Sequence, residues 1–315
     1  MRAPAGLRAP LPRRVPRGVR SSRDELLGLR CFGGAMRRAL ALDDDPREAP
    51  SAIAARSQGM EYTESRPYLP GDDVRRIDWR VTARTGRTHT KLFRLEHCND
   101  LYCLVDQRAR MRFGTRGAFK SVVAAEIAVL VGWAAAAEGD QFGALVAGAR
   151  TASIRTGGAD GATAALCSAL AASESDDPAS TDEAPLDALA ARAAEASPFG
   201  TRFIVVSDFA DRDAALERAI KLLRGRGVLT LVWVLDPIDE HLPPAGRYPL
   251  TDGREHLVLD TAARGVREAH AHDFAVRRER LQRCVALPGT RCHAVRTGAD
   301  LFLALERSFA SAASQ

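Results

Sequence analysis

The sequence has almost no lysine and lacks the short motifs of several common enzyme classes. Its 315 residues include only Lys91, Lys120 and Lys221, so arginine carries nearly all of the positive charge. Because alanine and glycine are also abundant, we attribute this bias to coding composition rather than to function. No GxSxG elbow, P-loop, HExxH or complete GxGxxG sequence occurs. These absences argue against the enzyme mechanisms that depend on those motifs.

Paired cysteines and membrane-length apolar runs are also missing. The six cysteines include no CxxC pair and no zinc-type pairing with histidine, which predicts scattered buried thiols in a reducing compartment. The longest apolar stretch, residues 122–137, contains Glu126 and is shorter than the roughly 20 residues that span a bilayer. No apolar signal-peptide core follows Arg13 and Arg14. We therefore expect a cytoplasmic protein with no membrane span.

Positive charge is concentrated at the start of the chain. The formal net charge is +5, but residues 1–42 hold ten arginines against Asp24 and Glu25, a net +8, which leaves −3 for the remainder. Residues 1–45 are predicted to form a disordered basic leader with a short helix. Because a nucleic-acid-binding protein needs a basic face on the fold itself, we do not expect nucleic acid as the partner. Binding of nucleic acid through the basic tail stays open as an alternative.

The remaining sequence divides into two parts with different patterns. Residues 46–98 look like strands and turns, including a Pro70-Gly71 turn, and predict a β-rich region. Over residues 99–315, short apolar runs alternate with helical patterns. That alternation predicts an α/β domain of Rossmann type, with a doubly wound, mainly parallel sheet and helices on both faces.

Three predicted strands are followed by aspartate. Asp106, Asp208 and Asp236 come at or directly after the apolar runs that end near residues 105, 206 and 235. In a doubly wound sheet the carboxyl ends of the strands form the binding crevice, so these side chains are candidates for a functional site. Aspartate is also a good helix cap and turn former, and a structural role is the alternative, above all for Asp236.

A series of short motifs runs through most of the chain: Arg66-Pro-Tyr68, Pro70-Gly-Asp-Asp73, Arg75 to Trp79, Ala83-Arg84, Phe93, Glu96, Asp106, Phe113-Gly114, Lys120, Gly139-Asp140, Gly143, Ser207-Asp208-Phe209, Asp236-Pro237 and Leu242-Pro243. In the order and spacing of these motifs, residues 59–315 resemble a soluble subgroup of the bacterial family called domain of unknown function fifty-eight. This resemblance implies a von Willebrand factor A-like domain and a partnership with a MoxR-type AAA+ ATPase, in which family members act as adaptors.

The resemblance also implies a metal site, which this sequence changes. A von Willebrand factor A-like domain binds Mg²⁺ through Asp-x-Ser-x-Ser, a later threonine and a later strand-end aspartate. Here Asp106 and Asp208 match and Thr163 is a candidate, but Arg108 and Arg110 replace both hydroxyl ligands. Arginine offers only hydrogen-bond donors and stays protonated, so it cannot ligate a cation. We predict that no metal cofactor binds and that Arg108 pairs with Asp106 or Asp208.

Two further alternatives concern the same arginines and the region before them. Arg108 and Arg110 could instead face solvent and receive an acidic segment of a partner. The earlier region is either a structural unit, in which Tyr68 and Trp79 pack on the main domain and aspartates pair with arginines, or a docking surface for the ATPase. Its candidate residues are Arg66, Tyr68, Gly71, Asp72, Asp73, Arg75, Asp78, Trp79 and Arg84.

The sequence therefore favours a non-enzymatic interaction or adaptor module with a degenerate metal-ion-dependent adhesion site. Such a module would act with a MoxR-type ATPase in the assembly or maturation of other proteins. The alternatives are a metal-dependent hydrolase that uses the strand-end aspartates, with Asp72, Asp73 and Asp78 as possible helpers, and the nucleic-acid binder described above.

Overall fold

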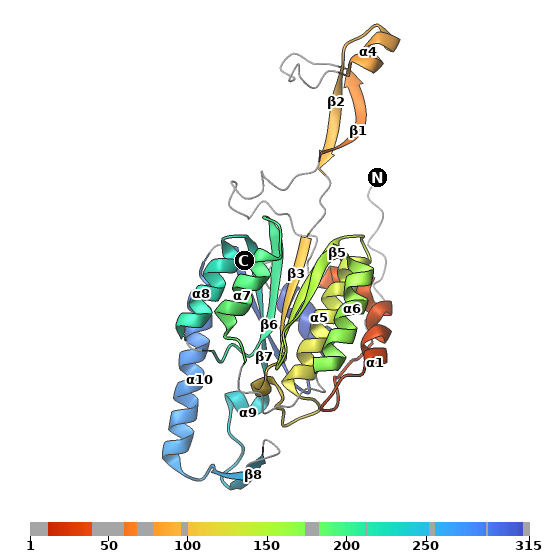
Figure 1. The fold of residues 1–315 in the computed structure, drawn as a ribbon. Helices are drawn as coiled ribbons and strands as arrows, with labels where there is room; N and C mark the ends of the chain where they lie inside the picture. Colours follow the sequence, from red (N-terminus) through yellow and green to blue (C-terminus); the bar gives the residue numbers. More distant parts are fainter. Residues whose placement is uncertain are drawn as a thin grey trace.

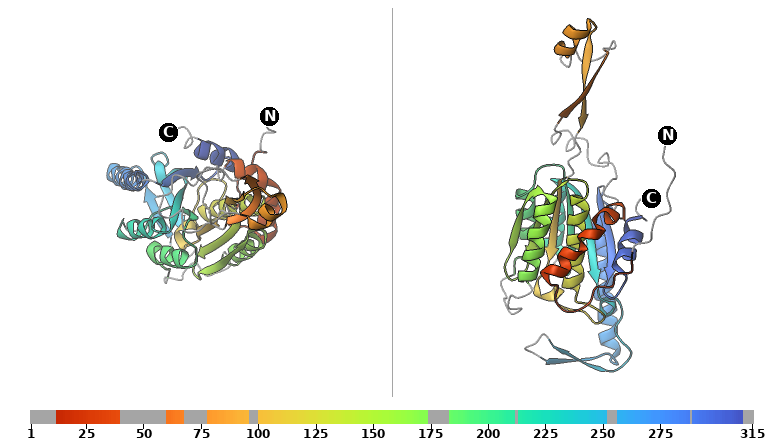
Figure 2. Two further views of the ribbon diagram at one scale, coloured as in Figure 1. Left: turned by 90° about the horizontal axis from the view of Figure 1, so that it is seen from above. Right: turned by 90° about the vertical axis from the view of Figure 1, so that its right-hand side faces the viewer.

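The computed structural model contains a six-stranded sheet with helices on both faces (Figure 1). Seen from above, the sheet lies between two layers of helices (Figure 2, left). The residues that it describes are 12–39, 60–67, 78–95, 100–173, 183–211, 213–251, 256–287 and 289–310.

The sheet has the strand order of a Rossmann-type fold. Its members are β3 (Asp100–Asp106), β4 (Gln141–Ala147), β5 (Ala152–Gly158), β6 (Thr201–Ser207), β7 (Gly227–Leu235) and β10 (Thr290–Arg296). The order across the sheet is β10-β7-β6-β3-β4-β5, and only the edge strand β5 is antiparallel to its neighbour. The predicted fold class is confirmed. The order reverses between β3 and β6, where such sheets form their binding crevice.

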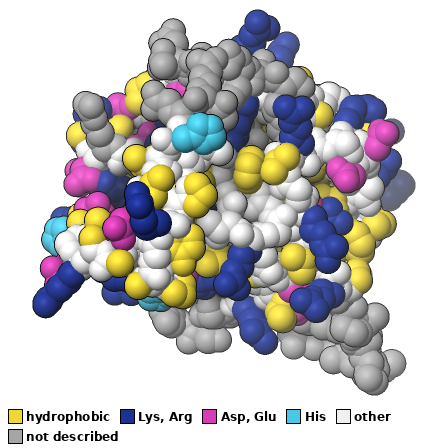
Figure 3. Space-filling model, turned by 90° about the horizontal axis from the view of Figure 1, so that it is seen from below, with side chains coloured by type: hydrophobic (Ala, Val, Ile, Leu, Met, Phe, Trp, Pro, Cys, Tyr) yellow, Lys and Arg dark blue, Asp and Glu magenta, His cyan; other side chains and the backbone are white. Residues whose placement is uncertain are grey.

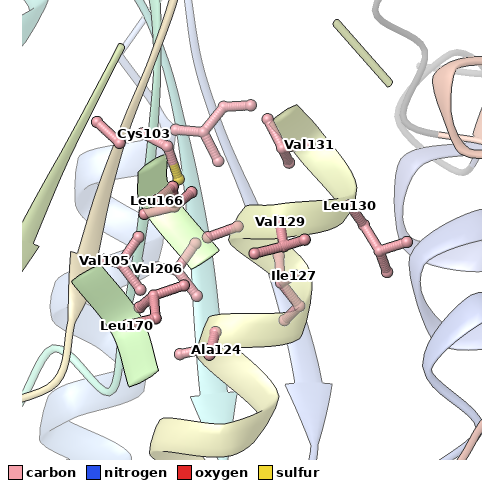
Figure 4. Close-up of a cluster of buried hydrophobic side chains, with 14 of the residues drawn as sticks. Cys103, Val105, Ala124, Ile127, Val129, Leu130, Val131, Leu166, Leu170 and Val206 are labelled. Carbon is pink, nitrogen blue, oxygen red and sulfur yellow. The ribbon is translucent and has the colours of Figure 1, made fainter. Parts of the chain in front are cut away.

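Alternate residues of β3 supply two separate cores. Leu101, Cys103 and Val105 face one helix layer, and Tyr102 and Leu104 face the other, as the two-residue period of a strand requires. Figure 4 shows Cys103 and Val105 packed beside α5 and α6. Because both faces are covered, the strands read as continuous apolar runs in the sequence.

Helices fill both layers. The first layer holds α1 (Arg23–Gly28), α2 (Gly33–Ala39), α5 (Lys120–Ala136), α6 (Ala159–Ser173) and α11 (Leu301–Ala310), with the 3₁₀ turn η1 (Leu29–Phe32). The second holds α7 (Leu186–Glu195), α8 (Asp213–Arg224) and α10 (Arg264–Val285). Within the described residues, none of these helices combines the length and apolar character needed to cross a membrane.

Residues 1–45 were predicted to be a disordered basic leader with a short helix; in the structure residues 12–39 are ordered, and helical structure is present in α1 and α2. The amino-terminal segment 12–22 lies against the domain, where Gly18 donates to the Gly117 carbonyl and accepts from the Phe119 amide, at 2.9 and 3.1 Å. Arg14 meets buried Glu126 of α5 through two hydrogen bonds of 2.7 and 2.8 Å. Composition made this segment look unfolded, but its arginine neutralises a carboxylate that the core would otherwise hold unpaired.

The helices that follow are part of the main core. Leu26, Leu29 and Met36 are almost fully buried in the first layer. Gly33 permits close packing, since a Cβ there would lie 2.4 Å from the Trp133 carbonyl oxygen. Arg37 then pairs with buried Asp140 at 2.5 Å. The α/β domain therefore extends to residues before 99, beyond its predicted boundary.

The β-rich region predicted over 46–98 contains an antiparallel hairpin and one helix that was not predicted. β1 (Met60–Pro67) pairs with β2 (His89–Leu95), and α4 (Trp79–Thr85) lies between them in sequence. Asp78 caps α4 by accepting from two backbone amides at 3.1 Å, and Gly86 ends it with a positive φ of 68°. These elements stand apart from the sheet in Figures 1 and 2.

A second hairpin stands beyond the opposite end of the sheet. β8 (Arg247–Thr251) pairs with β9 (His256–Asp260), between the short helix α9 (Pro237–Glu240) and α10. Figure 2 shows the hairpin beyond the end of α10. Pro249 lies within β8, as proline does in strands whose backbone needs few hydrogen bonds to neighbours.

Replacing Arg14 with alanine should destabilise the domain. The change leaves the Glu126 carboxylate buried without its cation, so we expect the free energy of unfolding to fall by about 2–3 kcal/mol. This loss is smaller than for a fully buried ion pair because Arg14 is partly exposed. Burial raises the pKa of Glu126, an effect that Arg14 opposes. Without Arg14 the folded state holds this proton more tightly, so the loss should shrink as pH falls toward 4.5 and grow as pH rises. Urea unfolding at several pH values measures both effects.

Two variants control this experiment. Arg13→Ala removes a neighbouring exposed arginine and should change stability by less than about 0.5 kcal/mol. Adding Glu126→Gln to the Arg14 variant should restore part of the lost stability. Equal effects of the two arginine substitutions would contradict the assigned role of the pair.

Candidate functional site

Two strands end side by side where the strand order reverses. β3 and β6 are parallel neighbours, with Val105 opposite Val206, so their carboxyl ends meet at one edge of the sheet. Asp106 is the last residue of β3 and is fully buried, and Asp208 follows β6 and is 2% exposed. The structure thus brings together two of the predicted site residues.

Arg108 lies between two carboxylates. Its guanidinium donates from Nε to Asp106 Oδ1 at 2.9 Å and from Nη2 to Asp106 Oδ2 at 2.7 Å. Its other edge donates to Asp211 Oδ1 and Oδ2 at 2.7 and 2.9 Å. Both pairs are bidentate, the geometry in which arginine binds a carboxylate most strongly. The predicted pairing of Arg108 with Asp106 is present, whereas Asp211 was missed.

Arg110 completes the same arrangement from the rim. Its Nη2 lies 3.0 Å from Asp106 Oδ2, its Nε lies 3.0 Å from Asp208 Oδ1, and it also forms an ion pair with Asp211. The side chain of Arg110 is 28% exposed, against 5% for Arg108. The alternative in which both arginines face solvent is therefore wrong for Arg108 and holds only partly for Arg110.

Lys120, at the start of α5, extends the network. Its Nζ lies 3.0 Å from Asp208 Oδ2 and 3.5 Å from Asp239 Oδ2. We call this set the strand-end cluster, and its members are Asp106, Arg108, Arg110, Lys120, Asp208, Asp211 and Asp239. Every carboxylate in it faces a cation, so three cations offset most of the charge of the four aspartates.

Burial and pairing act in opposite directions on the cluster. Burial alone raises the pKa of Asp106, but the hydrogen bonds and charges of Arg108 and Arg110 outweigh it and hold the pKa well below its ordinary value. Burial also lowers the pKa of Arg108, and its two aspartates more than reverse that effect. The pKa of Asp211 is likewise lowered against the effect of burial. These groups stay ionised at neutral pH.

The cluster does not fit a divalent cation. Asp106 Oδ2 accepts from Arg108, from Arg110 and from Ser207 Oγ at 2.6 Å, and Asp106 Oδ1 accepts from Arg108. The two guanidinium groups lie where ligand oxygens would be required, and they place positive charge beside the candidate ligands. A metal would have to displace both arginines to reach Asp106.

Thr163 is not part of the cluster, which corrects its assignment as a candidate ligand. It lies in α6, and its hydroxyl donates to the Ala159 carbonyl at 2.6 Å. α6 begins directly after β5, which runs antiparallel to β4 and ends beside Gln141, the first residue of β4. The direction of β5 therefore places Thr163 toward the amino ends of the parallel strands.

Asp236 has a structural role, which was the alternative to a role in the functional site. It caps α9 by accepting from the Ile238 amide. It also accepts from the Thr115 hydroxyl at 2.5 Å and from the Thr297 hydroxyl at 2.6 Å. Asp236 therefore ties three loops together at this edge of the sheet. Although burial opposes the effect, these hydrogen bonds lower its pKa.

The turn after β6 is strained and held in place. Phe209 has a φ of 49°, unusual for a bulky residue, and its side chain is fully buried. Trp233 Nε1 donates to the Asp208 carbonyl at 3.0 Å, and Arg280 donates to the Phe209 carbonyl at 2.6 Å. These contacts fix the direction in which Asp208 enters the cluster.

The residues of the β-rich region lie elsewhere. Asp78 is buried and caps α4, while Trp79 is 70% exposed and Arg84 is also exposed. The hypothesis that Trp79 packs on the main domain is therefore wrong. Arg66 lies in β1. The other candidates, Tyr68, Gly71, Asp72, Asp73 and Arg75, lie outside the described residues.

The molecular surface agrees with a covered cluster. Figure 3 views the molecule from the end where the parallel strands of the sheet terminate and shows basic and apolar side chains spread over this face. The side chains of Asp106, Asp208 and Asp211 are 0%, 3% and 6% exposed, so the cluster presents little negative surface to solvent. Of its members discussed above, Arg110 is the one whose charged side chain reaches the surface substantially.

The chain is similar in sequence to one protein family and to several bacterial proteins. A model of the family described as "Protein of unknown function DUF58" matches residues 64–280. The uncharacterized proteins Mb1516 of Mycobacterium bovis and Rv1480 of Mycobacterium tuberculosis are each 29% identical over 263 residues, which cover 80% of this chain and 80% of theirs.

Solved structures share less with the chain. The hypothetical protein BatB from Bacteroides thetaiotaomicron is 15% identical, with 69% of this chain and 100% of that chain covered and a TM-score of 0.36. A von Willebrand factor type A structure from Catenulispora acidiphila is 14% identical, with 70% and 44% covered and a TM-score of 0.38.

Removing Arg108 should destabilise the protein more than any surface arginine. Arg108→Ala leaves Asp106 and Asp211 buried with too little positive charge beside them, so we expect the free energy of unfolding to fall by about 3–5 kcal/mol. The contribution of these aspartates is present above their ordinary pKa near 3.8 and disappears as pH falls through their lowered values. The difference between variant and parent should therefore narrow below pH 3.8. Chemical unfolding provides the measurement, with exposed Arg155→Ala as the control.

Titration with Mg²⁺ and Mn²⁺ should show no micromolar binding at the cluster. The physical reason is that both carboxylate oxygens of Asp106, which would have to bind the metal, already accept hydrogen bonds from two guanidinium groups. Isothermal calorimetry on the purified protein measures this directly. Micromolar binding that Asp106→Ala abolishes would overturn the prediction. Weak binding that this substitution leaves unchanged would come from a metal site outside the cluster.

Proposed function

This chain belongs to the DUF58 family, and we propose that it works as a non-enzymatic protein-interaction module. The observation that supports this proposal is the strand-end cluster. At the edge where an open α/β sheet normally places its chemistry, Asp106, Asp208 and Asp211 are each held by a cation. No carboxylate of the cluster is free to act as a general base or to bind a metal.

The partner we propose is a MoxR-type AAA+ ATPase, with which the protein would assist the assembly or maturation of other proteins. This part of the proposal comes from the family resemblance. The degenerate metal-ion-dependent adhesion site would then be a rigid structural element, because Asp106 and Arg108 are too buried to contact a partner directly.

Trp79 is the residue that we propose as a docking contact. It is 70% exposed on α4, which stands apart from the sheet in Figure 1. A large exposed aromatic side chain is typical of the residues that contribute most to protein interfaces. Asp78 caps the same helix and presents Trp79 in a fixed position.

The two alternatives have less support. A metal-dependent hydrolase would need accessible ligand oxygens, and a screen for phosphatase and esterase activity with Mn²⁺ tests it. A nucleic-acid binder would use the basic tail, yet Arg14 and Arg37 of that region face the carboxylates of Glu126 and Asp140. A gel shift at physiological salt, with the full chain and with a variant that lacks the first 11 residues, tests whether the rest of the basic tail binds nucleic acid.

Replacing Trp79 with alanine should abolish capture of the ATPase without unfolding the protein. The side chain is mostly exposed, so stability should change by less than about 0.5 kcal/mol. At a hot spot the affinity should fall by roughly 30-fold or more. The measurement is a pull-down from the native host with and without nucleotide, followed by titration of the purified ATPase.

Phe199→Ala is the matched control. Phe199 is 50% exposed and stacks with Arg226 on the main domain, so its removal deletes a similar exposed aromatic group elsewhere. If the Trp79 variant captures as much ATPase as the parent, α4 is not the docking site. If the parent itself captures none, the proposed partner is wrong.

A further inference from the structure

A groove of about 540 Å³ lies between α8 and α10 on the second helix layer. Each helix contributes residues at positions i, i+3, i+4 and i+7, so each presents one face along about two turns. From α8 these are Glu217, Ile220, Lys221 and Arg224, and from α10 and its end they are Arg280, Arg283, Cys284 and Leu287. Two turns of helix correspond to a length of roughly 10 Å.

The groove combines apolar residues with cations. Ile220 and Cys284 are buried, and Leu287 is 42% exposed at the end of the groove. Four basic residues line it against the single acid Glu217. Neither Lys221 nor Arg283 forms an ion pair within the part of the chain that the structure describes. The lining therefore suits a ligand that carries both carboxylates and apolar groups.

Favourable interactions with helix ends explain some of this positive charge. Lys221, Arg224 and Arg283 lie in the last turns of their helices, where cations offset the negative end of the helix dipole. Arg280 does not lie in a last turn and is 6% exposed. Its Nε is buried without a hydrogen-bond partner among the described residues. The guanidinium of Arg280 is held by Asp213 and by the Phe209 carbonyl, so the exposed positive charge at the groove comes from the other cations, Lys221 and Arg283 among them.

We propose that this groove binds an acidic segment of a partner protein that presents leucine-like side chains between carboxylates. The apolar groups would cover Ile220, Cys284 and Leu287, and the carboxylates would face Lys221 and Arg283. Recognition of an amphipathic helix by a groove between helices is an established mode of peptide binding. This inference rests on the proposed function as an interaction module, and it adds a second contact that is separate from Trp79.

Arg280 links the groove to the strand-end cluster. Besides lining the groove, it donates to the Phe209 carbonyl and forms an ion pair with Asp213. Phe209 follows Asp208 in the strained turn after β6. Arg280 is therefore a poor choice for a test by substitution, because its removal would disturb the turn as well as the groove. Lys221 and Arg283 are exposed and suitable.

The probe is a fluorescein-labelled peptide of 14 residues, with leucine at i, i+3, i+4 and i+7 spacing and glutamate at most other positions. Fluorescence anisotropy with the full chain should show saturable binding that weakens as salt rises. The double variant Lys221→Glu/Arg283→Glu should weaken binding at least 10-fold. A peptide with lysine in place of glutamate should bind at least 10-fold more weakly than the acidic one.

The matched control is Arg264→Glu/Arg278→Glu, which makes the same charge change on α10 outside the groove and should leave binding within 2-fold. Thermal unfolding of both variants shows whether they remain folded. Absence of saturable binding to the parent, or equal loss in the two double variants, overturns the proposal. Because this assay contains no ATPase, a failure to bind the peptide would not contradict the pull-down result for Trp79. A failure of the pull-down would likewise leave the peptide result valid.

Discussion

The pairing of Arg108 with Asp106 and Asp211 is the interaction on which the carboxyl edge of the sheet depends. Asp106 is fully buried at the end of the central strand β3, where an isolated carboxylate would be strongly destabilising. Arg108 supplies two hydrogen bonds to it and two to Asp211, so the ends of β3 and β6 are tied through one guanidinium. Arg110 and Lys120 then bring Asp208 into the same network. A site built in this way is rigid and chemically occupied, and for that reason we place partner recognition elsewhere.

Buried ion pairs recur in this protein, and arginine supplies most of the cations. Arg14 pairs with Glu126, and Arg37 pairs with Asp140, both at the boundary between the amino-terminal region and the first helix layer. The planar guanidinium can satisfy two carboxylate oxygens at once, which a lysine cannot do with the same geometry. The arginine-rich composition therefore has structural consequences, whatever its origin in coding bias. Such pairs help to specify how the amino-terminal region docks, because a different docking would leave the buried carboxylates of Glu126 and Asp140 without these cations.

The sequence was sufficient for features that depend on local pattern and insufficient for those that depend on long-range packing. The apolar run before Asp106 and the strand–helix alternation predicted the sheet, and the two-residue spacing of Arg108 made its pairing with Asp106 foreseeable. Asp211 joins the cluster only because the crossover from β3 to β6 brings it there. Thr163 was misplaced because nothing in the sequence marks β5 as antiparallel. The α4 helix was missed although Asp78 and Gly86 provide a cap at each end, since its seven residues are too few to show a clear periodicity.

The amino-terminal segment 12–22 has a consequence for the order in which the molecule can be completed. The Arg14 amide donates to the Asp300 carboxylate, and the Arg14 carbonyl accepts from the Leu301 amide at 2.7 Å. These contacts join residues that are synthesised 286 positions apart. During translation, residues 12–22 cannot complete these contacts until residues 300 and 301 have been made. The docking of this segment is therefore a late step of folding, because its partners come from both α5 and the turn before α11.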